Sequence, residues 1–146
     1  MGRVKPGYPD RMPTERPRLL FVHAHPDDES SKGASTVAKY ATEGIASTLV
    51  CCTGGEAGSV LNPAMDLPEV IDNLAAVRLE ELEAATSIIG YDKVDLLGYH
   101  DSGMPDSAEN ARPDNFWNAD LDEAIGKLVA IIRRDRPQVI VTYGDD

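Results

Sequence analysis

The sequence predicts an α/β fold with a mostly parallel sheet and helices on both faces. Three short apolar runs have the length and composition of buried strands: residues 19–24, 47–53 and 139–143. A fourth run, residues 93–98, shows the same pattern less clearly. Helical stretches separate these runs, and strands that alternate with helices are typical of a parallel sheet. Such sheets bind ligands beyond the carboxyl ends of their strands, so the residues that follow each run are the first candidates for a functional site.

Three stretches have the apolar spacing of helices: residues 30–43, 66–89 and 119–134. The first is expected to end near Gly44, because glycine suits the position after a helix. Asp66 can cap the second helix, with Glu69 three residues further on as in a capping box, and Gly90 stops it. The third is expected to end before Pro137, because the residue ahead of a proline avoids helical backbone angles.

The composition limits the partners that this chain can have. Its 146 residues include 25 Asp plus Glu against 14 Lys plus Arg, a formal net charge of −11. This balance argues against nucleic acid or an anionic membrane, because both are bound through basic patches. Cys51 and Cys52 are adjacent and cannot build a disulfide framework, so a cytoplasmic location is the simplest interpretation. Residues 1–17 are expected to form a mobile arm, followed by one domain over residues 18–146.

The first predicted strand leads directly into His25-Pro26-Asp27-Asp28. A neutral imidazole and a carboxylate are good ligands for zinc or another divalent cation, and the proline restricts how the following acids point. Successive Asp side chains point in different directions. One can therefore bind the metal while its neighbour acts as general base on metal-bound water. A turn in which Asp28 only caps the next helix is the alternative.

Other polar residues can likewise be interpreted either as functional or as purely structural. Residues 53–59 read Thr-Gly-Gly-Glu-Ala-Gly-Ser, which permits close approach to a ligand or forms a flexible turn, and which lacks the dinucleotide-binding fingerprint. Arg78 interrupts the apolar stripe of the 66–89 helix, so it binds a ligand, forms an internal ion pair or extends to solvent. Asp101 follows the fourth strand and can be a simple turn residue. His23 lies inside the first strand and is interpreted as a satisfied core histidine.

The run from His25 to Glu29 resembles the signature of the PIG-L/LmbE-like zinc-dependent deacetylase family. This resemblance implies a Rossmann-like hydrolase that removes acyl groups from N-acylated glucosamine-type substrates, with one Zn²⁺ in each complete site. Carried over residue by residue, it makes His25 and Asp28 metal ligands and Asp27 the general base. It further implies a small-molecule glucosaminyl-inositol or mycothiol-conjugate substrate.

Further segments match the family in the same order along the chain. They imply that Glu56 borders the active site, that Arg78 contacts the substrate and that Asp101 binds sugar hydroxyls. Lys32 matches a lysine of the branch that hydrolyses mycothiol S-conjugates, although it can also be a solvated helix residue. Three segments resemble that branch most: residues 29–34, 52–56 and 61–63. The alternatives are the N-acetylglucosaminyl-inositol deacetylase branch of mycothiol biosynthesis and a non-catalytic sugar-binding module.

One part of the family pattern is missing. The family takes its third zinc ligand and a second catalytic histidine from a later segment, and this chain stops at Asp146 before reaching it. We therefore expect the N-terminal half of a family member, apparently truncated, and the activity of this chain on its own is left open. A complete site then requires self-association, or pairing with a missing C-terminal half. Alternatively, Asp145 or Asp146 supplies the remaining ligand.

Overall fold

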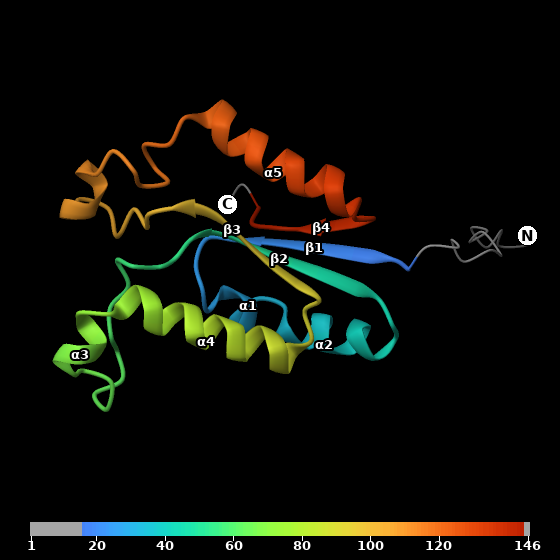
Figure 1. Cartoon of the computed structure of the whole chain (residues 1–146), viewed down its shortest axis with the longest axis horizontal. Coiled ribbons are helices and arrows are strands. Elements are labelled where there is room, and N and C mark those ends of the chain that lie inside the picture. Colours follow the sequence, from blue (N-terminus) through green and yellow to red (C-terminus); the bar gives the residue numbers. More distant parts are fainter. Residues whose placement is uncertain (1–15, 145–146) are drawn as a thin grey trace, which may run out of the picture.

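The computed structural model describes residues 16–144, which form a parallel four-stranded sheet with helices on both faces (Figure 1). The strands follow one another along the chain as β1 (Arg18–His23), β2 (Ala46–Thr53), β3 (Lys93–Tyr99) and β4 (Val139–Val141). Their order across the sheet is β3-β2-β1-β4. The predicted α/β class and the mostly parallel sheet are confirmed.

Strand β1 lies inside the sheet, with β2 on one side and β4 on the other. Leu19 of β1 pairs with Ser47 of β2 and with Val139 of β4. The chain first adds strands on one side of β1 and later returns to its other side, which makes a topological switch point at β1. Ligands of open parallel sheets bind in the crevice beyond the carboxyl ends of the strands at such a point.

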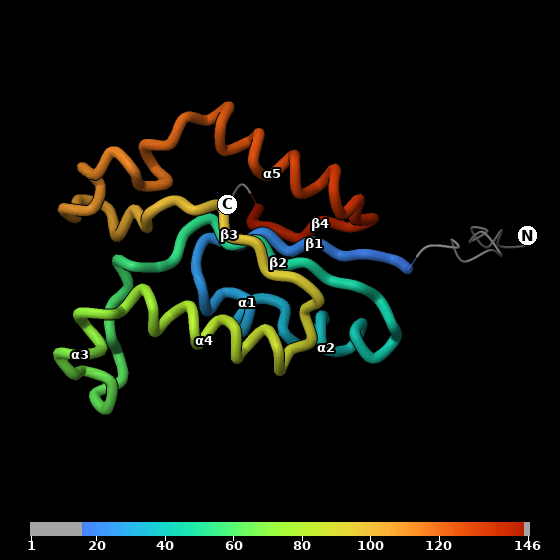
Figure 2. Tube along the Cα trace, viewed as in Figure 1, coloured from blue at the N-terminus to red at the C-terminus, as the bar shows by residue number. Residues whose placement is uncertain are grey.

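The helices cover the two faces unequally. In the described residues they are α1 (Asp28–Ser31), α2 (Ala34–Thr42), α3 (Pro68–Ile71), α4 (Leu74–Ile89) and α5 (Leu121–Asp135), with a 3-10 turn at Ala108–Ala111. Helix α5 lies on one face of the sheet, and α1, α2 and α4 lie on the other (Figures 1 and 2). The third predicted helix is confirmed as α5, which Asp120 caps by accepting a hydrogen bond from the N–H of Glu123.

The single helix predicted over residues 30–43 is wrong, because α1 ends at Ser31 and α2 begins at Ala34. Gly33 separates them with φ at 138°. A Cβ atom at this position would lie 3.0 Å from Cε1 of Phe21, so the ring of a buried β1 residue packs directly against the break. Only glycine accepts both this backbone angle and this close approach.

The single helix predicted over residues 66–89 is likewise divided into α3 and α4. Asp66 does not cap it, since α3 begins at Pro68 and its N-cap residue, Leu67, makes no side-chain capping bond. Proline suits the first turn of a helix because its missing N–H is not needed there. The predicted end is confirmed, because Gly90 terminates α4 in a left-handed conformation with φ at 98°.

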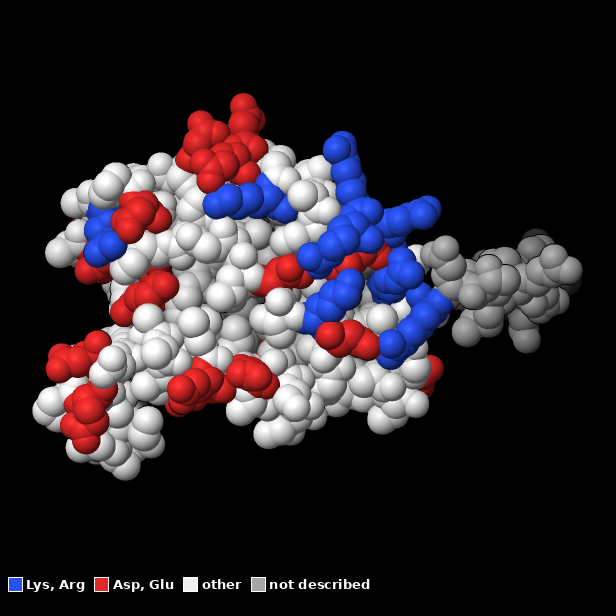
Figure 3. Space-filling model, in the orientation of Figure 1, with Lys and Arg blue, Asp and Glu red and all other residues white. Residues whose placement is uncertain are grey.

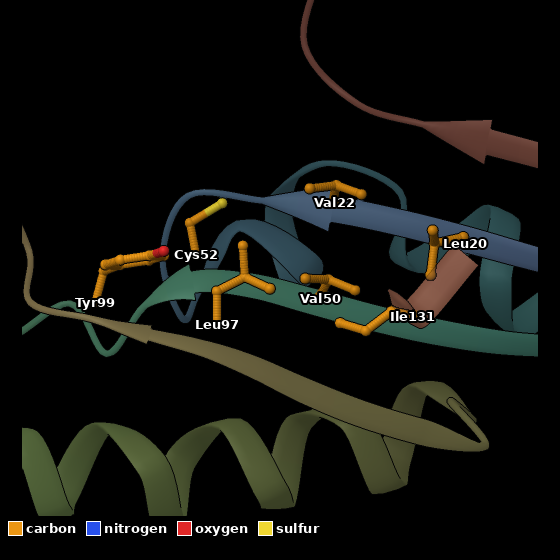
Figure 4. Packing of buried hydrophobic residues seen from close by; sticks show 7 residues of the cluster. All are labelled: Leu20, Val22, Val50, Cys52, Leu97, Tyr99 and Ile131. Carbon is orange, nitrogen blue, oxygen red and sulfur yellow. The ribbon is translucent and has the colours of Figure 1, made fainter. Parts of the chain in front are cut away.

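Alternate side chains of the strands build two hydrophobic cores, one on each face of the sheet. The core under α5 contains seven buried residues, which Figure 4 shows: Leu20, Val22, Val50, Cys52, Leu97, Tyr99 and Ile131. The core on the other face joins β1 and β2 to α2 and α4 through Phe21, Leu49, Cys51, Val37 and Leu82. These cores anchor the strands whose carboxyl ends carry the loops of the candidate site.

Strand β4 differs from the fully buried strand predicted over residues 139–143. It is shorter, and Val139 and Ile140 are 50% and 44% exposed. Within the described residues β4 is an edge strand, so its outer side has no neighbouring strand. An apolar edge strand of this kind favours pairing with further polypeptide.

Most of the predicted N-terminal arm, residues 1–15, lies outside the described residues. Arg16 and Pro17 contact the domain: Arg16 Nη1 lies 2.8 Å from Oδ1 of Asp92, and the carbonyl of Pro17 accepts a hydrogen bond from the N–H of Ala46. None of the helices between residues 16 and 144 combines the length and the apolar character that crossing a bilayer requires.

Candidate active site

The candidate site lies where β1 ends, at the switch point between β2 and β4. The chain leaves His23 at the end of β1, turns through residues 24–27 and enters the short helix α1 at Asp28. The segment after β2 contributes Gly55 and Glu56 to the same edge, and the segment after β3 contributes Asp101. The structure therefore gathers residues from three strand ends that the sequence places far apart.

His25 lies between two buried carboxylates. Its Nδ1 is 3.8 Å from Oδ2 of Asp28, and its Nε2 is 3.5 Å from Oδ1 of Asp101. The backbone N–H of His25 also donates a hydrogen bond of 3.1 Å to Oδ2 of Asp28. The imidazole is half-exposed, whereas the two Asp side chains are almost fully buried. An imidazole in contact with carboxylates is a typical part of a divalent metal site.

Asp28 is surrounded by donors. Oδ1 pairs with the ammonium group of Lys32, and Oδ2 accepts hydrogen bonds from the hydroxyl of Tyr143, at 2.5 Å, and from the N–H of His25. Burial opposes ionisation, but hydrogen bonds from Lys32, Tyr143 and the His25 backbone outweigh it and lower the pKa of Asp28 to about 2. Asp28 is therefore ionised at neutral pH, which is the state in which a carboxylate binds a metal.

Asp27 has an uncommon backbone conformation, with φ at 100°, and its side chain is 74% exposed. Non-glycine residues with such angles are often found at functional sites, where the surroundings hold them in place. Its N–H donates a hydrogen bond of 2.8 Å to Oε2 of Glu29, a side chain buried beneath the turn. Asp27 therefore presents a carboxylate to solvent from a fixed turn.

Arg78 connects this turn to the glycine-rich segment. Its guanidinium donates to Oδ2 of Asp27 at 2.7 Å, to the carbonyl of Gly55 at 2.9 Å and to the carbonyl of Pro26. The side chain is only 14% exposed. The internal ion pair, one of the expected alternatives, satisfies this buried cation. Contact between Arg78 and a substrate remains a prediction.

Asp101 and Glu56 form the other side of the site. The N–H of Asp101 donates to Oε2 of Glu56 at 3.0 Å, and Oδ1 of Asp101 accepts from the N–H of Gly103 at 2.9 Å. This arrangement links the segment after β2 to the segment after β3.

Sequence reasoning missed two residues of the site. Tyr143 follows β4, and its hydroxyl accepts from the N–H of Ala24 at 3.1 Å while donating to Asp28. Burial and the bond to Asp28 raise the pKa of Tyr143 to about 12, so it stays a donor at neutral pH. Glu29, adjacent to the motif in the sequence, is 1% exposed and accepts from both Asp27 and Ser30. The available signals in the sequence were the position of Tyr143 at the end of a predicted strand and the position of Glu29 directly after the His-Pro-Asp-Asp motif.

The buried cysteines and the buried histidine beside the site are unsuited to nucleophilic catalysis by a thiol. Burial raises the pKa of Cys51 to about 12 and that of Cys52 to about 11, so neither thiol is a nucleophile at neutral pH. His23 is buried as expected, and burial lowers its pKa. The prediction that it is satisfied is wrong, since neither ring nitrogen has a hydrogen-bond partner among the described residues.

The donor set fits part of a zinc site. His25 and Asp28 supply one imidazole and one ionised carboxylate, which are two of the ligand types that zinc sites use, and Tyr143 and Lys32 hold the carboxylate by hydrogen bonds. Over residues 16–144, no group of three or more His, Cys, Asp or Glu side chains is arranged to hold a metal ion. The predicted alternative ligands, Asp145 and Asp146, lie outside the described residues.

The structure places the His-Pro-Asp-Asp motif at the end of the first strand of a parallel α/β sheet. The profile of the family described as PIG-L, GlcNAc-PI de-N-acetylase, matches residues 20–146. The chain belongs to this family.

Relatives agree with this membership. The chain is 50% identical over 135 residues to a 1D-myo-inositol 2-acetamido-2-deoxy-alpha-D-glucopyranoside deacetylase of Streptomyces avermitilis, and the matched region covers 88% of the chain and 46% of the relative. It is 47% identical over 136 residues to a mycothiol S-conjugate amidase of Streptomyces coelicolor, and this match covers 91% of the chain and 46% of the relative. An N,N'-diacetylchitobiose deacetylase from Pyrococcus horikoshii superposes with a TM-score of 0.62 at 25% identity, over 84% of this chain and 39% of that one. The chain thus spans about half the length of the curated relatives it matches.

Proposed function

We propose that this chain supplies two zinc ligands and the general base for hydrolysis of an N-acyl amide bond on a glucosaminyl substrate. The observation that carries this proposal is the cluster at the end of β1. There His25 lies between the carboxylates of Asp28 and Asp101, with Asp27 on the adjoining strained turn. Membership in the PIG-L family and the names of its relatives as deacetylase and amidase support it.

Each residue has a distinct task in this reaction. His25 and Asp28 would hold the zinc ion, which when bound lowers the pKa of a coordinated water to about 7. Asp27 accepts a proton from the attacking water, because its carboxylate is exposed and is held in place by its pairing with Arg78. Arg78 and Glu29 fix that carboxylate and its backbone, so that the proton acceptor is held in place before the substrate arrives.

The sugar half of the substrate would lie against Asp101 and Glu56, whose carboxylates border the other side of His25. A mycothiol S-conjugate is the first candidate substrate, supported by the resemblance of the segments around Lys32 and by the relative from Streptomyces coelicolor. N-acetylglucosaminyl-inositol is the second candidate, supported by the relative from Streptomyces avermitilis. The free Cys51 and Cys52 suit the reducing cytoplasm that we propose as its location.

The test compares both substrates with one preparation of the chain. Zinc content is measured after dialysis, and release of the free amine is followed from an S-conjugate and from the acetylated compound. Where the dialysed chain retains zinc, we expect hydrolysis of one of the two, and Asp27→Asn should lower its rate by roughly 10²- to 10⁴-fold with zinc content unchanged. Asp66→Asn, at an exposed position before α3, serves as the matched control.

Two results would contradict the proposal in different ways. Full activity in Asp27→Asn would remove the assignment of the base. Binding of the sugar without turnover by the zinc-loaded chain would instead identify the alternative, a non-catalytic sugar-binding module.

A further inference from the structure

A cavity of about 340 Å³ opens beside Asp27, between α1, α4 and the segment that follows β2. From its position and lining we infer that it receives the acyl half of the substrate, and that this acyl group is larger than acetyl and carries an apolar part. This inference rests on the proposed function, because it assigns one side of the same site to one half of the amide.

The lining of the cavity combines charged and polar groups with apolar side chains. Asp27 and Arg78 lie on it where the turn meets α4. Its walls include apolar side chains of the post-β2 segment and of α3 and α4, among them Val60, Val70, Leu74, Val77 and Leu82. A ligand in the cavity therefore meets both hydrogen-bonding groups and apolar walls, which is the usual design of a specific pocket.

The position of the cavity separates the two halves of the amide. Asp101 and Glu56 are not part of its lining, while Pro26 and Asp27 are. His25 stands between the two sides, with Nε2 facing Asp101 and Nδ1 facing Asp28. If the sugar lies against Asp101, the amide bond lies at His25 and Asp27, and the acyl carbon chain leaves toward the cavity.

The size of the cavity decides against a methyl group as its full occupant. Pockets that enclose small ligands have volumes of about 300–1,000 Å³, so this one lies in their range. An acetyl group would fill a small part of it and leave the walls formed by Leu74, Val77 and Leu82 in contact with water. A longer or ring-bearing apolar substituent would cover them, and each buried methylene tightens binding by roughly fourfold.

The experiment measures binding to the metal-free chain, in the presence of a chelator, so that no turnover occurs. N-acetylglucosamine and N-hexanoylglucosamine differ by four methylenes and are compared by calorimetry. We expect the hexanoyl compound to bind at least tenfold more tightly. Val77→Trp fills the cavity from α4 and should abolish that difference. Ile88→Trp, on the same helix at a position that is 86% exposed, should preserve it.

A second variant, Val60→Trp, fills the cavity from the opposite segment and covers the case in which Val77→Trp does not fold. Equal affinity for the two sugars would overturn the inference, as would a difference that survives both cavity-filling changes. Failure of both sugars to bind would overturn it as well. A chain-length effect that depends on Val77 supports the cavity even if the zinc-loaded chain hydrolyses neither substrate, in which case only the proposed reaction fails.

Discussion

At the scale of the residue, Glu29 joins the fold to the site. It is among the largest fully buried side chains of the described residues, although it is an acid. Oε2 accepts from the N–H of Asp27 at 2.8 Å and Oε1 from the hydroxyl of Ser30 at 2.6 Å. A buried carboxylate requires such partners, and here the partner is the residue with the strained backbone. Glu29 therefore holds the turn that presents Asp27.

We predict that Glu29→Ala lowers the free energy of unfolding by about 2–4 kcal/mol, because it leaves two donors without an acceptor and creates a cavity. Glu29→Gln keeps one carbonyl oxygen and the side-chain volume, so its loss should be smaller, about 1–2 kcal/mol. Urea unfolding of both variants measures the difference. Equal losses in the two variants would contradict a hydrogen-bonding role.

The site could be predicted from the sequence only where its residues are close along the chain. His25, Asp27 and Asp28 are consecutive or nearly so, and their chemistry is visible in the motif. The bond from Tyr143 to Asp28 and the pairing of Arg78 with Asp27 join residues from distant parts of the chain. Periodicity shows that Arg78 needs a partner, but only the folded arrangement identifies it.

At the scale of the element, strands were predicted better than helices. The strand runs are apolar throughout because both faces of the sheet are covered, so their positions follow from composition. The breaks between α1 and α2 and between α3 and α4 depend on tertiary packing. Gly33 gives no sign in the sequence that Phe21 will press against it, and the helical spacing continues through the break.

We predict that Gly33→Ala destabilises the domain by about 1–3 kcal/mol, because alanine is strained at a φ of 138° and its Cβ would contact Phe21. Gly126→Ala is the matched control. Gly126 lies within α5 with open space around it, so alanine there should be neutral or stabilising by up to about 1 kcal/mol. Thermal and urea unfolding compare the two. A loss at Gly126 as large as that at Gly33 would contradict this account.

At the scale of the whole molecule, charge is unevenly distributed. Lys and Arg side chains gather at the end where β1 begins, as Figure 3 shows. There Asp135, at the end of α5, accepts from Arg134 at 2.7 Å, from Lys93 at 2.7 Å and from Thr48 at 3.0 Å. These bonds, that from Arg134 first, hold the pKa of Asp135 well below its usual value despite burial. The cluster ties α5 to the starts of β2 and β3.

The sign of the pH effect follows from this lowered pKa. The folded state favours ionised Asp135, so its stabilisation is present above the pKa of the unfolded chain, about 3.9, and is lost as pH falls further. We predict that Asp135→Asn is less stable than the parent chain between about pH 5 and pH 8, and that the difference shrinks below about pH 4. Urea unfolding across this range measures it. Glu80→Gln, at an exposed position on α4, should show no comparable change.

The position of β1 in the sheet has a consequence for folding during synthesis. Its residue Leu19 pairs with Ser47 on one side and with Val139, far along the chain, on the other. The second edge of β1 therefore has no partner until nearly all the described chain has emerged from the ribosome. Until then the unpaired N–H and C=O groups of that edge are open to other polypeptides in the cell. Tyr143 arrives last, and with it the final donor to Asp28. The carboxylate of Asp28 therefore acquires all of these donors only after β4 has been made.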